Sequence, residues 1–257
     1  MGNSFLLREG EKIDFILKGR LGIIQRERGY RFSIDALLLA NFVNLQDGDD
    51  LIDMGTGSGI IAVLLAKRMR QGRILGIEIQ KQLVSIAKRN VQLNRLSGKI
   101  NVIQGDIRFP EAFCHPQSFS VAVFNPPYRR LNAGRINPDP ERAAARHEIF
   151  GTVADFIAAA AYALRLEGHM YAIYPSTKMA SLVAQMRSFN IEPKRLCIVY
   201  SRLGASASFV LVDGIKGGGE ELDILPPFFV YNKKGGYTRK MDHIFRGLAS
   251  FESHGDV

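Results

Sequence analysis

Residues 50–59 read DLIDMGTGSG, a short apolar run that ends in three closely spaced glycines. The apolar run is typical of a buried strand, and residues 60–70 (IIAVLLAKRMR) have the pattern of an apolar helix. A glycine turn between a strand and a helix lets the backbone approach a ligand, to which the helix start presents its N–H groups. The stretch therefore predicts an α/β fold with a ligand site at the glycine turn.

The spacing of the glycines and a carboxylate in the next strand indicate which kind of ligand the site binds. The glycines follow the pattern G-x-G-x-G, and Ile60 occupies the position where the dinucleotide fingerprint has a small residue, which argues against NAD. Residues 74–79 predict a second strand, in which Glu78 lies 19 residues after Gly59. A carboxylate at this spacing accepts hydrogen bonds from ribose hydroxyls, so the sequence predicts a nucleoside ligand.

Two further strands also end in polar residues. The strand predicted at 100–104 is followed by Gly105-Asp106-Ile107, and the strand predicted at 121–124 is followed by Asn125. In an open α/β sheet, ligands lie at the carboxyl ends of the strands. The four strands are therefore expected to place their polar and glycine residues around one site.

The motif Asn125-Pro126-Pro127-Tyr128 indicates chemistry at a planar nitrogen. The lone pair of an exocyclic amine or amide is delocalised, so a catalyst must hold its N–H groups while the nitrogen becomes tetrahedral. The Asn125 side-chain carbonyl and the Pro126 backbone carbonyl supply two acceptors, and Tyr128 supplies a flat face for stacking. The alternative is an ordinary turn at the end of a strand.

The remaining pattern predicts an α/β, Rossmann-like fold with a seven-stranded, mostly parallel sheet, helices on both faces and a reversed last strand. The other predicted strands are 169–174, 194–200 and 207–212, and the other predicted helices are 80–94, 152–166 and 177–189. Residues 1–257 are expected to form a single domain. It consists of an N-terminal segment (1–48), a catalytic core (49–215) and a basic tail (216–257) packed on or near the core.

Two segments outside this core have distinctive sequences. Residues 29–40 (GYRFSIDALLLA) predict a helix with Ser33 as its N-cap, placed to pack over the ligand. Residues 129–147 contain five arginines and follow the Asn125 motif directly. A long polar loop inside a compact domain is usually functional, so this segment is a candidate substrate loop.

Charge and composition narrow the class of protein. The net charge is +9 and the pI about 9.7, with basic residues in the 129–147 segment and in the tail around Lys233 and Lys234. This balance favours a polyanionic partner, although a basic surface alone is weak evidence. Two cysteines and five histidines predict neither a disulfide framework nor a metal site. Without an apolar run long enough to span a bilayer, the protein is expected to be cytoplasmic.

The order of these motifs resembles the class I S-adenosylmethionine-dependent methyltransferases, within them the branch that methylates amino groups. The resemblance implies that Asp53 and the three glycines face the methionine end of the cofactor, Glu78 its ribose and Asp106 its adenine. Ile79, Ile107 and Asn125 are expected to line the same site. The implied cofactor residues are Asp53, Gly55, Gly57, Gly59, Glu78, Ile79, Asp106, Ile107 and Asn125.

Residues 29–40, 53–59, 125–128, 145–148 (ARHE) and 236–238 (GYT) more narrowly resemble the bacterial tRNA(Val) adenine-N6 methyltransferases. This resemblance implies methyl transfer to adenine N6 in tRNA, with Asn125, Pro126 and Tyr128 as catalytic residues. The implied substrate-binding residues are Tyr128, Arg129, Arg130, Lys233 and Lys234.

Two alternatives stay open. One is a protein glutamine N5-methyltransferase that acts on a release factor or ribosomal protein, although such enzymes carry a larger helical domain before the first strand. The other is a basic RNA-binding protein that has the fold without catalysis. A DNA adenine methyltransferase is disfavoured because the target-recognition domain expected of that class is not evident.

Overall fold

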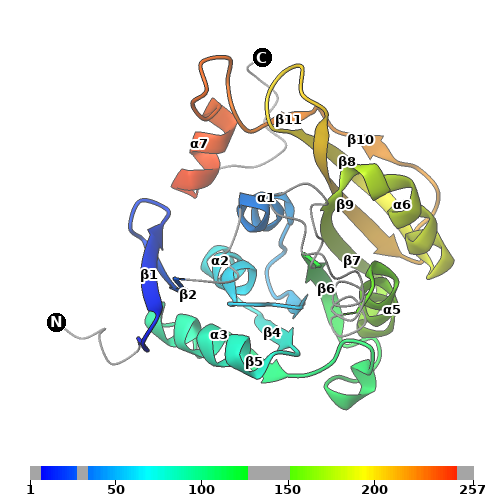
Figure 1. The fold of residues 1–257 in the computed structure, drawn as a ribbon. Coiled ribbons are helices and arrows are strands. Elements are labelled where there is room, and N and C mark those ends of the chain that lie inside the picture. Colours follow the sequence, from blue (N-terminus) through cyan, green and yellow to red (C-terminus); the bar gives the residue numbers. More distant parts are fainter. Residues whose placement is uncertain (1–6, 28–33, 127–150, 248–257) are drawn as a thin grey trace, which may run out of the picture.

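The computed structural model describes residues 7–27, 34–126 and 151–247, which form a central sheet with helices on both faces (Figure 1). The strands of the sheet lie in the order β10-β8-β9-β7-β6-β3-β4-β5, and β11 also pairs with β8. Its long strands are β3 (Asp50–Met54), β4 (Arg73–Glu78), β5 (Ile100–Gln104), β6 (Phe119–Phe124), β7 (Leu164–Pro175), β8 (Ile191–Tyr200) and β9 (Ala207–Lys216). The helices are α1 (Ile34–Phe42), α2 (Ile60–Arg68), α3 (Lys81–Leu93), α5 (Val153–Ala163), α6 (Met179–Ser188) and α7 (Arg239–Arg246), with short 3-10 turns at Pro110–Ala112 and Ser176–Lys178.

The topology of the sheet confirms the predicted fold class. Strands β3 to β7 are mutually parallel, whereas β9 runs antiparallel to both β7 and β8. The chain proceeds outward from β3 through β4 to β5 and then returns to β6 on the other side of β3. Such a reversal of strand order opens a crevice at the carboxyl ends of the strands, next to β3.

The strand count of seven needs correction. All seven predicted strands are present, but β10 (Asp223–Ile224) and β11 (Phe228–Phe229) also join the sheet, both parallel to β8. A separate antiparallel hairpin, β1 (Glu11–Ile16) and β2 (Leu21–Arg26), lies in the N-terminal segment for which only a helix was predicted. Two-residue strands carry no periodicity, so their pairing with β8 has no local signal.

The predicted helix at 152–166 was too long. Thr152 caps the start of α5 through a reciprocal capping box with Asp155, and the helix ends at Ala163. Leu164 instead begins β7 and pairs with Phe119 of β6. The Lys216 ammonium of β9 donates to the carbonyls of Ala161 and Leu164, at 2.5 and 2.8 Å, so the helix end is satisfied by a distant strand.

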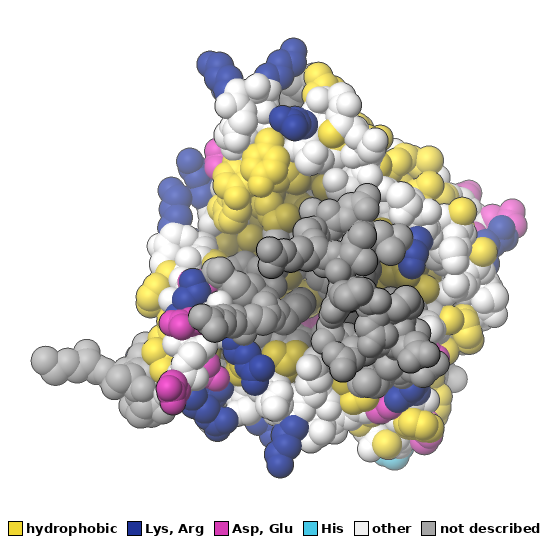
Figure 2. All heavy atoms as spheres, viewed as in Figure 1, with side chains coloured by type: hydrophobic (Ala, Val, Ile, Leu, Met, Phe, Trp, Pro, Cys, Tyr) yellow, Lys and Arg dark blue, Asp and Glu magenta, His cyan; other side chains and the backbone are white. Residues whose placement is uncertain are grey.

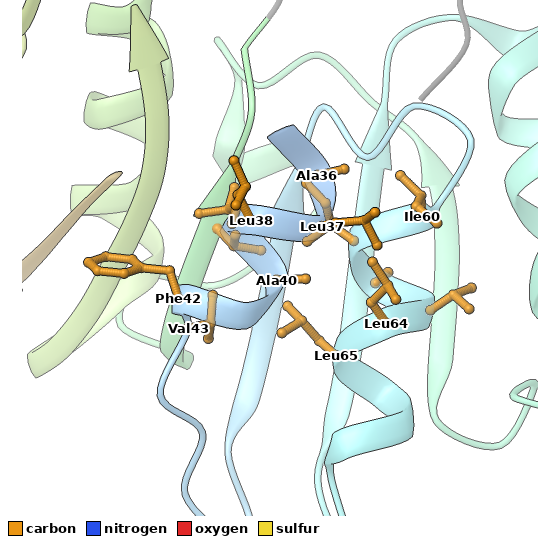
Figure 3. Close-up of a cluster of buried hydrophobic side chains, with 14 of the residues drawn as sticks. Ala36, Leu37, Leu38, Ala40, Phe42, Val43, Ile60, Leu64 and Leu65 are labelled. Atoms are coloured by element: carbon orange, nitrogen blue, oxygen red, sulfur yellow. The ribbon is translucent and has the colours of Figure 1, made fainter. Parts of the chain in front are cut away.

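Two apolar clusters cover the two faces of the sheet. Helices α1, α2, α3 and α7 contribute to one cluster, and α5 and α6 contribute to the other. In Figure 3, Leu37 of α1 extends toward Ile60 and Leu64 of α2, while Phe42 points away from them. The Phe42 ring meets Tyr171 of β7 edge-to-face, with ring centroids 6.1 Å apart. Each fully buried leucine of such a cluster contributes about 1.5–3 kcal/mol, so α1 is firmly held beside α2.

The β1–β2 hairpin is attached to α3 by two buried asparagines. Asn90 accepts a hydrogen bond from the Ile24 N–H at 2.6 Å and donates to the Ile24 carbonyl at 3.2 Å. One turn further along α3, Asn94 makes the same pair of bonds with Gly22, at 3.3 and 2.8 Å. These side chains supply hydrogen-bond partners to backbone N–H and carbonyl groups of β2 and thereby hold the hairpin on this helix.

Candidate active site

The predicted site residues come together at the carboxyl edge of the sheet. Met54 of β3 is in register with Ile77 of β4 on one side and with Phe124 of β6 on the other. The residues that follow, Gly55, Glu78 and Asn125, therefore leave adjacent strands side by side. From β6 to β5 the edge spans three strand spacings, about 14 Å, which suits an elongated ligand.

The glycine loop has a backbone that other residues would strain. Gly55, Gly57 and Gly59 have φ values of 69°, 59° and 81°, in the left-handed region. The Thr56 N–H donates to the Ile77 carbonyl at 2.9 Å, which ties the loop to β4. A Cβ added at Gly59 would lie 3.2 Å from the Ala87 Cβ, so the glycine also permits close packing of the loop on α3.

Asp53 lies fully buried at the base of this loop. Its Oδ2 accepts a hydrogen bond from the Thr56 hydroxyl at 2.5 Å, whereas its Oδ1 has no hydrogen-bond partner within the described part of the chain. Burial raises the pKa of Asp53 to about 7; hydrogen bonds from Thr56 and the Ala62 N–H oppose this rise, and the nearby Glu78 adds to it. A buried acceptor without a partner is available to a cationic or hydrogen-donating ligand group.

Glu78 is also buried and supports the loop directly. Its two oxygens accept hydrogen bonds from the Gly57 N–H at 3.0 Å and the Gln80 N–H at 2.9 Å. Burial raises the pKa of Glu78, and these N–H groups counteract part of that rise. A carboxylate has about four acceptor positions, so Glu78 can also accept a hydrogen bond from a ligand hydroxyl group.

Asp106 follows β5 and has a partner that the sequence did not indicate. The Arg108 guanidinium pairs with it at 2.6 Å, and the Arg108 backbone N–H donates to it at 3.0 Å. These contacts lower the pKa of Asp106, which keeps the carboxylate ionised. Ile107 beside it is buried, and Ile79 after β4 is half-buried, so both offer apolar surface.

The structure describes only the first half of the Asn125-Pro126-Pro127-Tyr128 motif. Asn125 is half-buried at the end of β6 and Pro126 is buried. Below them, Phe124 packs on Phe156 of α5, with ring centroids 5.4 Å apart. The remaining predicted residues, Pro127, Tyr128, Arg129 and Arg130, lie outside the described residues, as does Ser33.

Lys233 and Lys234 are exposed on a tail segment, apart from the glycine loop. This segment follows β11, whose partner β8 is separated from β6 by β9 and β7. The structure thus gathers the predicted cofactor residues at one point and leaves these two lysines further along the sheet.

Sequence reasoning missed Asn90 as a support of the site. Its amide donates to the Ser58 carbonyl of the glycine loop at 2.8 Å, in addition to its bonds with Ile24. The only sequence signal is a polar residue within the otherwise apolar face of a helix, because its partners are 32 and 66 residues away.

Comparison with known proteins identifies the family. The model of the methyltransferase small domain family matches residues 33–189. A protein of Histophilus somni (strain 129Pt) named tRNA1(Val) (adenine(37)-N6)-methyltransferase is 29% identical over 203 residues, which cover 79% of this chain and 83% of that protein. A protein of the same name from Porphyromonas gingivalis (strain ATCC 33277) is 29% identical over 183 residues, which cover 69% and 71%.

A solved structure from Agrobacterium tumefaciens, described as a predicted O-methyltransferase, has the same fold. Its TM-score is 0.69 at 22% identity, and the match covers 84% of this chain and 97% of that one. At this identity the likeness establishes the fold alone.

The residues at the carboxyl edge fit S-adenosylmethionine, which combines a ribose with a cationic methionine end. Glu78 is a carboxylate beside the glycine loop that can accept from a ribose hydroxyl, and Asp53 Oδ1 is an acceptor without a partner among the described residues. The glycine loop between them lets a ligand approach the backbone. Together with the family match over more than half of the chain, this means that the chain belongs to the methyltransferase small domain family and is an S-adenosylmethionine-dependent methyltransferase.

Proposed function

We propose that this enzyme methylates N6 of an unpaired adenine in tRNA, in the cytoplasm. The observation that carries the proposal is the position of Asn125 and Pro126, which leave β6 directly beside the glycine loop of β3. Two acceptor groups are thereby held next to the cofactor residues, as transfer to an amine requires. The names of the related proteins from Histophilus somni and Porphyromonas gingivalis support adenine N6 in tRNA as the acceptor.

Each edge residue has a role in this proposal. Glu78 accepts hydrogen bonds from the ribose hydroxyls, and Asp53 with Gly55, Gly57 and Gly59 holds the methionine end. Asp106 accepts from the adenine amine, between the apolar side chains of Ile79 and Ile107. When bound, the cofactor supplies an electrophilic methyl group on a sulfonium.

The target amine is held by the other half of the site. The Asn125 side-chain carbonyl and the Pro126 backbone carbonyl accept the two N–H groups of adenine N6, which lets its lone pair turn toward the methyl group. The nitrogen that accepts the methyl group would then release one proton to solvent. Tyr128 stacks on the base, and Arg129, Arg130, Lys233 and Lys234 hold the RNA.

Residues 1–257 act in this proposal as one methyltransferase domain. In support, Met241 and Ile244 of α7 are buried in the apolar cluster that also contains α1 and α2, so the tail packs on the core. Among the described residues, no helix has the length and apolar character needed to cross a membrane. The described residues likewise contain no group of three acidic, histidine or cysteine side chains arranged for a metal ion.

Methyl transfer to defined substrates tests the proposal. The protein is incubated with methyl-labelled cofactor and, separately, with tRNA, ribosomal RNA, DNA and release factors. We expect N6-methyladenosine after digestion of the tRNA sample. Label in a glutamine side chain would establish the protein-modifying alternative, and label in another nucleoside would overturn adenine N6. Cofactor binding without transfer to any substrate would favour the non-catalytic alternative.

A further inference from the structure

The tail contains a tight hairpin between β11 and α7, residues 230–238, which we call the tail hairpin. The Asn232 N–H donates to the Gly236 carbonyl at 2.8 Å, and the Asn232 side chain donates to the Tyr237 carbonyl at 2.9 Å and accepts from the Lys234 N–H at 2.9 Å. At its end, Thr238 caps α7 and donates its hydroxyl to the Phe229 carbonyl at 2.7 Å. These bonds hold the hairpin in one shape and anchor it to the sheet.

The tail hairpin presents a pair of stacked aromatic rings to solvent. Tyr231 and Tyr237 stack with ring centroids 5.2 Å apart and planes 18° apart, and Phe245 of α7 packs against Tyr237 at 4.8 Å. Despite this packing, Tyr231 is 38% exposed and Tyr237 is 40% exposed. In Figure 2, hydrophobic side chains gather where α7 lies in Figure 1, with Lys and Arg side chains standing above them. If these two tyrosines only packed in the protein core, their side chains would be more fully buried.

The charge around this pair complements a polyanion. Lys233 and Lys234 occupy the tip of the turn, and within the described part of the chain neither makes an ion pair. Residues 228–247 contain five Lys and Arg residues and one acidic residue, Asp242. A flat aromatic surface flanked by cations is the usual composition of sites that bind unpaired nucleic acid strands.

The tail hairpin stands at the same edge of the sheet as the active site. Phe229 of β11 is in register with Tyr200, the last residue of β8, and both strands run parallel to β6. The hairpin therefore leaves the sheet at the carboxyl edge, where Asn125 also lies. The hairpin follows β11, which pairs with β8 on the side away from β9, so four strand spacings, about 19 Å, separate β11 from β6. A few nucleotides of one RNA strand can bridge this distance.

We propose that the Tyr231–Tyr237 pair is a stacking platform for a second unpaired base of the RNA substrate, with Lys233 and Lys234 on its flanking phosphates. The inference rests on the proposed function, because it assumes an RNA that also reaches Asn125. It adds a contact to a base other than the target adenine. That base is recognised by its flat face, so the platform accepts any unpaired base.

Salt dependence separates stacking from phosphate contact. Binding of a fluorescent anticodon stem-loop RNA is measured across a salt series for wild type, Tyr231→Leu, Tyr231→Phe and Lys233→Gln. We expect Tyr231→Leu to bind roughly tenfold more weakly at every salt concentration, with an unchanged slope, and Tyr231→Phe to bind as wild type does. Lys233→Gln is expected to lower the slope by about 0.7–0.9.

If Tyr231→Leu does not fold, a fluorescent variant can test the stacking platform directly. The chain has no tryptophan, so Tyr231→Trp introduces a single indole. Its fluorescence should be quenched by the stem-loop RNA and not by inorganic phosphate. An unquenched tryptophan in a variant that still binds RNA would overturn the platform, as would wild-type affinity in a folded Tyr231→Leu.

The experiments distinguish an error in the proposed function from an error in the stacking platform. If wild type neither binds the RNA nor methylates tRNA, the proposed function is wrong. If wild type does both and the Tyr231 variants match it, only the platform is wrong. A change in sedimentation of Tyr231→Leu without a change in RNA affinity would assign this face to self-association instead.

Discussion

Asn125 and Asp53 lie on adjacent strands and differ in their exposure to solvent. Asn125 is half-buried at the end of β6, where a substrate can reach it, whereas Asp53 is fully buried below the glycine loop. The Asn125 amide does not titrate, so its action should not depend on its own protonation, whereas the charge of the buried Asp53 carboxyl changes with pH. The two residues therefore predict different experimental signatures.

Asn125→Ala is expected to retain cofactor binding and lose most methyl transfer. The lost acceptor acts most strongly as the nitrogen becomes tetrahedral, and its loss should cost on the order of 3 kcal/mol, or roughly a hundredfold in rate. Single-turnover kinetics measures this effect. Asn101→Ala, in the exposed position of β5, is the matched control and should be unaffected. Near-normal turnover of Asn125→Ala at saturating RNA would remove Asn125 from catalysis.

Asp53 is expected to make the cofactor-free protein less stable as the pH rises. Its folded-state pKa of about 7 lies above that of an unfolded aspartate, so between these values the folded state holds the extra proton. The free energy of unfolding then falls with pH, by at most about 1.4 kcal/mol per pH unit. Urea unfolding between pH 4.5 and 7.5 should show a steeper fall in wild type than in Asp53→Asn, in which the raised pKa of Glu78 still contributes a slope of the same sign. Parallel pH profiles would contradict the prediction.

At the scale of elements, α3 connects the N-terminal hairpin to the glycine loop. Asn90 binds both Ile24 of β2 and Ser58 of the loop, whereas Asn94 binds β2 and its own helix. Both side chains are buried and they differ chiefly in this one bond to the loop. They therefore form a natural pair of test and control.

Asn90→Ala is expected to weaken S-adenosylhomocysteine binding roughly tenfold, because the loop loses the donor that holds the Ser58 carbonyl. A lost bond to a buried acceptor costs about 1–3 kcal/mol. Asn94→Ala should lose similar stability but keep its cofactor affinity within about twofold. Calorimetric titration and thermal unfolding of both variants measure the two effects. Equal losses of affinity would show that Asn90 stabilises the fold without positioning the loop.

At the scale of the whole molecule, the net charge of +9 favours an anionic partner without locating it. The structure shows which basic residues lie near the carboxyl edge of the sheet. Lys233 and Lys234 rise from that edge beside β8, whereas exposed Lys67 and Arg70 lie at the end of α2, toward the opposite edge. Only the first pair is placed to share a substrate with Asn125.

Neutralising Arg129, Arg130, Lys233 and Lys234 together should weaken tRNA binding and leave cofactor affinity intact. Each lost phosphate contact lowers the salt slope by about 0.7–0.9. Binding of tRNA across a salt series measures this effect, with neutralised Lys67 and Arg70 as the control. Superimposable curves for wild type and the fourfold variant would mean that these charges are ordinary surface.

The sequence by itself determined the order of the strands and helices between residues 50 and 216, and it indicated which edge of the sheet carries the ligand site. The strands predicted at 50–54 and 100–104 match β3 and β5 because an apolar run bounded by turn residues is a local property. The glycine loop, Glu78 and Asn125 follow such strands directly, so parallel pairing is enough to bring them together. Their roles in cofactor and substrate binding stay predictions.

Only the tertiary structure decided the features that depend on distant contacts. The end of α5 at Ala163 depends on Lys216 of β9, and the short strands β10 and β11 form only because β8 offers free backbone groups. The link from Asn90 to Ser58 and the raised pKa of Asp53 depend equally on burial and geometry. Hydrogen bonds and desolvation act between groups brought together by folding, and a local sequence pattern contains neither their distance nor their burial.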